Sequence, residues 1–307
     1  MIVVDRLSKS YGQRKALNDI SFHIKKGECV GLIGLNGAGK TTIINILLGK
    51  SIPDIGLVRI FGQSSTSLSR NALKKIGCAS GAEYRLQRDL KIQYSLENCA
   101  AMYHIPADVY KARLAELCEK LGIAEFLQSE PQQLSWGQRM KCELALAVLP
   151  QPELLILDEA TIGIDTSAKE TILQYINSMH VKNQTTIIYS GHYLNEVERL
   201  CGRIIVLHDK SILYDGSTRT FSSKYGSYRT MRLKCNSLPD IEDLPVEKYC
   251  IERGEIIITF DKGKITAAEI IRHVRQKCEI LEIKLIEPNL EDTIKKIYSK
   301  ESSVKND

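Results

Sequence analysis

A glycine-rich run between residues 34 and 42 is the segment best suited to chemistry. It reads Gly34-Leu35-Asn36-Gly37-Ala38-Gly39-Lys40-Thr41-Thr42. Glycines let successive backbone N–H groups turn toward one anion, because no Cβ stands in the way. A helix N-terminus behind such a loop favours negative charge, Lys40 can reach β- and γ-phosphates, and the Thr41 hydroxyl can ligate Mg²⁺. The run therefore predicts a site for a nucleoside triphosphate.

A phosphate loop needs a strand before it and a helix after it. Residues 28–33 have the apolar pattern of a buried strand, and residues 43–48 have an apolar helical pattern. This strand–loop–helix context is what distinguishes a phosphate loop from a chance run of glycines.

Two carboxylates follow a second buried-strand pattern. The apolar residues 154–157 end in Asp158 and Glu159. Asp158 is suited to orient Mg²⁺ through its water shell, and Glu159 to activate an attacking water. The alternative is a strand end with two solvated acids, which is common. The phosphate loop upstream favours the chemical interpretation.

A second helix start lies between residues 134 and 140. Ser135 is a natural N-cap, and Gly137 would allow a backbone to approach closely. The pattern is typical of a plain capped helix after Pro131, or of a second helix N-terminus directed at an anion.

Composition places the chain among ordinary soluble globular proteins. It has 307 residues, 43% hydrophobic and 26% charged, with a formal net charge of +5. Such a mild excess of basic residues does not require a nucleic-acid partner. Nine scattered cysteines without a Cys-x-x-Cys pair indicate free thiols in a reducing compartment. We find no signal peptide and no apolar window of about 20 residues, so we expect a cytosolic protein.

Alternating strand and helix patterns predict an α/β protein with a parallel core sheet. Residues 1–30 have the pattern of short strands, a helical insert occupies about residues 84–150, and a hairpin spans residues 204–214. Pro106 suits the first position of a helix in this insert.

A Ser/Thr-rich stretch, residues 217–228, predicts a boundary between a domain of residues 1–220 and a small α/β domain of residues 228–307. The small domain has strand patterns at 228–235, 255–260 and 280–286. A capping box at Thr266–Glu269 opens a helix through Cys278, and Asn289 caps a last helix through Tyr298.

The order and spacing of these motifs over residues 1–216 resemble the nucleotide-binding subunit of an ABC transporter. The glycine loop resembles Walker A, and residues 155–159 resemble Walker B. The other resemblances are the signature motif at residues 134–138, the D-loop at 163–165, the switch histidine at His192 and the adenine-stacking aromatic at Tyr11.

The resemblance implies the P-loop ABC ATPase fold, with a parallel core sheet, an antiparallel β subdomain, a helical subdomain and a small C-terminal α/β domain. It implies ATP and Mg²⁺ as cofactors, and two such domains closing head to tail around two ATP molecules. The implied catalytic residues are Lys40, Glu159 and His192, and the implied Mg²⁺ residues are Thr41 and Asp158. The implied nucleotide contacts are Tyr11, Asn36, Gly37, Ala38, Gly39, Lys40, Thr41, Thr42, Ser135, Gly137, Gln138 and Asp165.

The sequence between the motifs is most similar to that of exporter ATPases of drug resistance and sodium extrusion. That branch implies a separate membrane-spanning permease as partner, and a peripheral location on the cytoplasmic side of the membrane. The second nucleotide-binding domain could belong to a homodimer or a heterodimer, and no nucleic acid is expected. The sequence does not name the transported substrate or the role of the C-terminal domain.

One position departs from the family pattern. Where the family places a glutamine that reaches Mg²⁺ and the attacking water, this chain has Ala82, followed by Glu83. An ATP-gated scaffold with impaired hydrolysis is therefore an alternative, although Glu159 argues against it. A soluble ABC ATPase outside transport is a second alternative, which the single phosphate loop and single signature disfavour.

Overall fold

The computed structural model describes residues 1–81, 85–191, 193–225, 228–237, 239, 241, 243–252 and 254–286. The chain divides into two compact units, one of residues 1–192 and 196–217, the other of residues 193–195 and 218–307. All nine cysteines are free thiols, as predicted. Within the described ranges, no helix is both long enough and apolar enough to cross a membrane.

The larger unit is built on a six-stranded sheet with the order β10-β9-β3-β8-β7-β6. Its strands are β3 (Cys29–Gly34), β6 (Ile76–Ser80), β7 (Leu154–Asp158), β8 (Thr186–Gly191), β9 (Arg203–His208) and β10 (Ser211–Ser217). All neighbours pair in parallel except β10, which is antiparallel to β9. Every residue of β3, β7 and β8 is buried, which is why these strands have continuous apolar runs.

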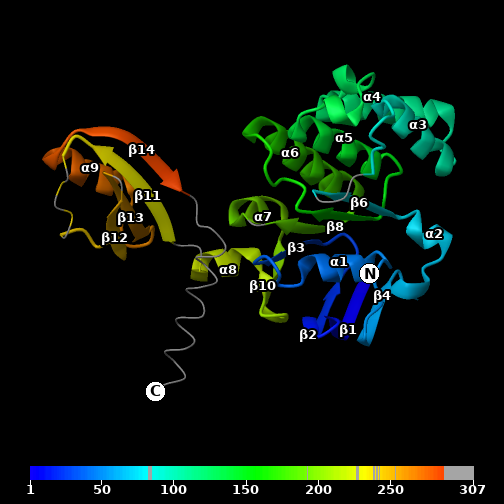
Figure 1. Cartoon of the computed structure of the whole chain (residues 1–307), viewed down its shortest axis with the longest axis horizontal. Coiled ribbons are helices and arrows are strands. Elements are labelled where there is room, and N and C mark those ends of the chain that lie inside the picture. The colour runs from blue at the N-terminus through cyan, green and yellow to red at the C-terminus, as the bar shows by residue number, and fades with distance from the viewer. Residues whose placement is uncertain are drawn as a thin grey trace. The chain divides into compact units, whose positions relative to one another are not determined.

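A four-stranded antiparallel sheet, in the order β2-β1-β4-β5, forms the second layer. Its strands are β1 (Ile2–Tyr11), β2 (Arg14–Ile24), β4 (Ile55–Ile60) and β5 (Gln63–Ser64). Helix α1 (Lys40–Leu47) lies between the two sheets (Figure 1). Its apolar side chains share one core with β1, β2, β4 and the strands of the larger sheet.

This unit also contains α2 (Arg70–Leu73), α3 (Ile92–Met102), α4 (Ala107–Leu121), α5 (Trp136–Val148) and α6 (Thr166–Asn183). Helix α7 (Leu194–Leu200) belongs to it from Glu196 onward. Helices α3, α4 and α5 form the predicted helical insert between β6 and β7. Pro106 is the N-cap of α4 and not its first residue, so that detail of the prediction was wrong. Helix α4 buries Leu117 and Leu121.

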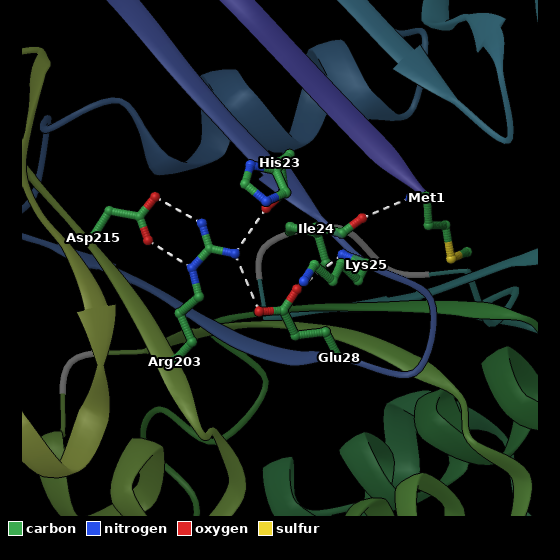
Figure 2. Close-up of polar contacts among 7 residues, drawn as sticks. All are labelled: Met1, His23, Ile24, Lys25, Glu28, Arg203 and Asp215. Carbon is green, nitrogen blue, oxygen red and sulfur yellow. Dashed lines mark hydrogen bonds and ion pairs between the residues drawn. The ribbon is translucent and has the colours of Figure 1, made fainter.

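Arg203, the first residue of β9, links the two sheets (Figure 2). Its Nε and Nη2 donate to the carboxylate of Asp215 at 2.6 and 2.7 Å. Its Nη1 donates to the carbonyl oxygen of His23 at 2.8 Å and to Glu28 at 3.1 Å. Because His23 belongs to β2 and Glu28 precedes β3, one guanidinium holds together strands from both layers.

The smaller unit contains a four-stranded antiparallel sheet, in the order β12-β13-β11-β14. Its elements are α8 (Thr218–Tyr225), β11 (Tyr228–Cys235), β12 (Lys248–Glu252), β13 (Glu255–Asp261), α9 (Ala267–Lys277) and β14 (Ile280–Ile286). The predicted capping box is present, since the side chain of Thr266 accepts from the N–H of Glu269 and the side chain of Glu269 accepts from the N–H of Thr266. Strand β12 and helix α8 were not predicted, and the predicted helix 289–298 lies outside the described residues.

Candidate nucleotide-binding site

The glycine loop passes from β3 into α1 through left-handed backbone. Gly37 has φ 80° and Gly39 has φ 108°, a region that L-residues with a Cβ rarely adopt. A Cβ on Gly39 would lie 2.4 Å from Cδ2 of Leu17 and 2.9 Å from the carbonyl oxygen of Ala16. The loop is therefore packed against β2, and glycine is required for both its conformation and its close contact.

A cavity of about 450 Å³ opens at this loop. Among the predicted site residues, those that line it are Tyr11, Asn36, Gly37, Gly39, Lys40, Thr41, Thr42 and Glu159. The structure thus brings together residues from β1, the glycine loop, α1 and the end of β7. Ala38, in the same loop, is buried and is not among the residues that line the cavity.

The cavity is also lined by three residues that were not predicted from the sequence: Arg14, Lys15 and Ala16. They open β2, and the tight turn at Gly12 pairs Arg14 with Tyr11 in the β1–β2 register. They could have been predicted, because Arg14 and Lys15 are adjacent basic residues just across a hairpin turn from Tyr11. Their positive charges suit a polyanionic ligand.

Lys40 lies inside the loop, with 4% of its surface exposed. Its Nζ donates to the carbonyl oxygens of Gly34 at 2.8 Å and Leu35 at 3.3 Å, and lies 3.6 Å from Oε1 of Glu159. Burial lowers the pKa of Lys40, and the negative charges of Glu159 and Asp158 oppose this shift. The amine is therefore held at the cavity between backbone carbonyls and one carboxylate.

The two acidic residues lie where β7 ends. Asp158 is the last residue of β7 and is buried. Glu159 turns out of the sheet with φ 55°, and its N–H donates to the carbonyl oxygen of Ser190 at 3.0 Å. A positive φ in a residue with a side chain is uncommon and costs about 1 kcal/mol or more. This turn gives the Glu159 side chain access to the cavity while Asp158 stays at the strand end.

Helix α5 begins with a complete capping box. The Ser135 hydroxyl accepts from the N–H of Gln138 at 3.3 Å, and the side chain of Gln138 accepts from the N–H of Ser135 at 2.9 Å. The indole N–H of Trp136 donates to the carbonyl oxygen of Ile162 at 2.7 Å. The first turn of α5 is thus attached to the loop that follows β7.

Gly137 is required by a close approach to the start of α6. A Cβ at this position would lie 2.8 Å from Cβ of Ala168 and 2.9 Å from Oδ2 of Asp165. Asp165 caps α6, since its Oδ1 accepts from the N–H of Ala168 at 2.9 Å. Asp165 and the first turn of α5 therefore form one packed group.

The predicted site residues fall into two groups. In the part of the chain that the structure describes, Ser135, Gly137, Gln138 and Asp165 do not line the cavity at the glycine loop. His192 and the departure at Ala82 and Glu83 lie outside the described residues. Tyr11 is 51% exposed, and its hydroxyl lies 3.3 Å from Oγ of Ser51.

Fold and cavity define an α/β protein with a phosphate loop, and comparisons with known proteins agree. The family model described as ABC transporter matches residues 17–162. The linearmycin resistance ATP-binding protein LnrL of Bacillus subtilis is 29% identical over 302 residues, which cover 95% of this chain and 96% of that protein. A Nod factor export ATP-binding protein I of Paraburkholderia xenovorans is 32% identical over 216 residues, which cover 70% of each chain.

A solved structure, the post-hydrolysis dimer of the ATP-binding cassette MJ0796 bound to ADP and Pi, is 25% identical. Its TM-score is 0.63, and the match covers 71% of this chain and 99% of that chain. The chain belongs to the ATP-binding proteins of the ABC transporter family. The predictions of the family, of its exporter branch and of the ABC ATPase fold are confirmed.

Proposed function

We propose that the chain hydrolyses ATP as the nucleotide-binding subunit of an exporter, and drives an unidentified substrate through a separate membrane-spanning subunit. The observation that carries the proposal is the cavity at the glycine loop. It is large enough for a nucleotide, at about 450 Å³, and its lining includes the basic residues Arg14, Lys15 and Lys40 together with Glu159. One site therefore contains both basic groups that can bind phosphate and a carboxylate that can activate water.

The glycine loop and α1 would bind the triphosphate. Backbone N–H groups at the start of α1 favour an anion, and Lys40 supplies a positive charge beside them. Arg14 and Lys15 add charge from β2. Tyr11, half exposed at the end of β1, offers a ring face on which adenine can stack.

Thr41 and Asp158 fit a hydrated Mg²⁺, because a hydroxyl and a carboxylate are the oxygen ligands that this ion prefers. The ion, when bound, neutralises charge on the phosphate oxygens. Glu159 lines the same cavity and accepts the proton of the attacking water. His192 follows β8 directly in the sequence, and we assign it contact with the γ-phosphate.

The second group of residues would complete the site of another subunit. Ser135, Gly137, Gln138 and Asp165 lie together but outside this chain's own cavity. A head-to-tail dimer would place them across the nucleotide held by the partner's glycine loop. The similarity to a cassette solved as a dimer supports this arrangement. The partner domain can be a second copy or a different chain.

A groove on the helical insert suits the membrane-spanning partner. It encloses about 250 Å³ between the middle and end of α3, the end of α5 and the segment 85–90. Met102 on its rim is 71% exposed, and Arg85 and Asn98 add polar contacts. Such a mixed apolar groove fits a short helix presented by a membrane protein, which would place the chain at the cytoplasmic face of the membrane.

We further propose that residues 228–307 are a separate accessory domain, either stabilising the dimer or simply solubilising the chain. The match to LnrL extends over 95% of this chain, so it includes this region. Deleting the residues after Ser227 and measuring ATP-dependent dimerisation would separate the two roles.

The test of the proposed function is ATP turnover by the wild type and by Glu159→Gln. We expect measurable turnover in the wild type and a loss of about 100-fold or more in the variant, because a general base contributes about 10²–10⁴-fold. Binding of a fluorescent ATP analogue should persist in both proteins. Equal, near-zero rates would instead favour the ATP-gated scaffold.

A further inference from the structure

A buried cluster of polar side chains lies outside the nucleotide cavity. Its centre is Glu196 of α7, which is only 3% exposed. Oε2 of Glu196 accepts from the Thr161 hydroxyl at 2.6 Å and from the Tyr189 hydroxyl. Oε1 of Glu196 lies 2.7 Å from Nζ of Lys169. The hydroxyl oxygens of Thr161 and Tyr189 are themselves 2.7 Å apart.

The charges of this cluster are compensated. A buried carboxylate is costly unless it is paired and hydrogen-bonded, and Lys169 and two hydroxyls meet that need. Burial, followed by the negative charge of Glu196, raises the pKa of Tyr189 well above its ordinary value. Tyr189 therefore keeps its proton and acts as a donor. Removing one member would leave the others buried with unmet polar groups.

The cluster joins four segments that lead into or out of the proposed catalytic positions. Thr161 follows Glu159 by two residues, and Lys169 follows Asp165 by four residues. Tyr189 of β8 precedes position 192 by three residues, and Glu196 follows it by four. The side chains that meet at Glu196 thus hold the chain on both sides of position 192 against the turn after β7 and the first turns of α6.

We propose that Glu196 is a positioning residue for ATP hydrolysis. Its contacts to Thr161, Tyr189 and Lys169 fix β8 and α7, which flank position 192 in the chain, relative to the segments that carry Glu159 and Asp165. In this way it sets the geometry of water activation without touching nucleotide. This inference rests on the proposed function. A displacement of about 1 Å in a catalytic group can cost about 100-fold in rate, so loosening this cluster should lower kcat and leave ATP binding intact.

The chain supplies a matched control on the same two helices. Arg199 of α7 donates to Glu170 of α6 at 2.7 and 2.8 Å, but both side chains are about half exposed. Exposed pairs of this kind contribute little. Glu170→Gln therefore removes a link between α6 and α7 while leaving the buried cluster whole.

The experiment compares Glu196→Gln and Glu170→Gln in the full chain. For Glu196→Gln we expect kcat to fall about tenfold or more, with KM for ATP within about twofold of wild type. For Glu170→Gln both values should stay within about twofold. Hydrogen exchange of the backbone amides between residues 190 and 200, measured without nucleotide, should become faster in Glu196→Gln only.

The inference is overturned where the two variants behave alike, or where Glu196→Gln raises KM and leaves kcat unchanged. Should Glu196→Gln fail to fold, Tyr189→Phe removes a single hydroxyl and should show the same loss of kcat to a smaller extent. Absence of turnover in the wild type would refute the proposed function, whereas the exchange comparison would still decide whether Glu196 holds this segment.

Discussion

Lys40 and Glu159 face each other at the nucleotide cavity, with Nζ of the lysine 3.6 Å from Oε1 of the glutamate. Under the proposed function, each has a role with a different partner, the lysine with phosphate and the glutamate with water. Their mutual contact helps to offset the cost of burying the amine.

The first prediction concerns Gly39→Ala. The new Cβ would meet the Ala16 carbonyl oxygen at 2.9 Å, and φ 108° is unfavourable for alanine. We expect the loop to shift and the affinity for a fluorescent ATP analogue to fall about tenfold or more, which corresponds to at least ~1.4 kcal/mol.

Gly202→Ala is its control, because nothing lies within 4 Å of the position a Cβ would take there and its φ is not in the left-handed range. This variant should bind the analogue as the wild type does. Unchanged affinity in Gly39→Ala would contradict the packing argument.

The core of the larger unit was predictable because its signals are local. The apolar run of β7 and the N-cap at Ser135 were visible in the sequence, as was the capping box at Thr266 in the smaller unit. Strand β12 was missed because its residues are mostly exposed and show no clean alternation. It is a strand because it pairs with β13, and the propensities of its own residues do not predict that pairing.

The cavity was predictable only in part, for a similar reason. The glycine loop and the acids after β7 carry their own motifs, whereas Arg14 and Lys15 reach the cavity through the β1–β2 hairpin. The Glu196 cluster was also missed, because Thr161, Tyr189 and Glu196 become neighbours only through tertiary packing.

The second prediction concerns Arg203→Lys. A lysine ammonium cannot reproduce the paired bonds to Asp215 together with those to His23 and Glu28 (Figure 2). We expect the free energy of unfolding of the larger unit to fall by about 1–3 kcal/mol, the range for losing charged hydrogen bonds. Urea denaturation measures it.

Arg199→Lys is the comparison for Arg203→Lys. Its ion pair with Glu170 is exposed, so its cost should stay below about 0.5 kcal/mol. Equal costs at both positions would show that Arg203 does not link the two sheets as described.

The third prediction concerns pH and Glu143. This carboxylate of α5 is buried and accepts from the N–H groups of Arg85 and Leu86 at 3.1 and 3.2 Å. Burial raises its pKa, and those backbone hydrogen bonds only partly oppose the shift. The folded state therefore holds this proton more tightly than the unfolded chain. The stability it contributes is present below the ordinary glutamate pKa and is lost as pH rises through the raised value.

Relative to Glu143→Gln, the wild type should accordingly lose stability as pH rises above the ordinary pKa of a glutamate, about 4.3. Urea midpoints at several pH values measure this difference. Glu153→Gln provides a control of opposite sign, because Lys75 lowers the pKa of Glu153. There the wild type should gain on the variant as pH rises toward the ordinary glutamate pKa, and should keep that gain above it. The same sign at both positions would contradict the assignment.

The fourth prediction uses Trp136, the single tryptophan of the chain. Its indole N–H is bonded to Ile162, beside Gly137 and Asp165 in the group that we assign to the dimer interface. ATP-driven closure in Glu159→Gln, which should trap the dimer, would cover this half-buried ring and shift its emission to shorter wavelength. Trp136→Phe should still dimerise on ATP addition, by gel filtration, without that signal. Dimerisation with no change in Trp136 emission would contradict the assignment of Trp136 and its neighbours Gly137 and Asp165 to the dimer interface.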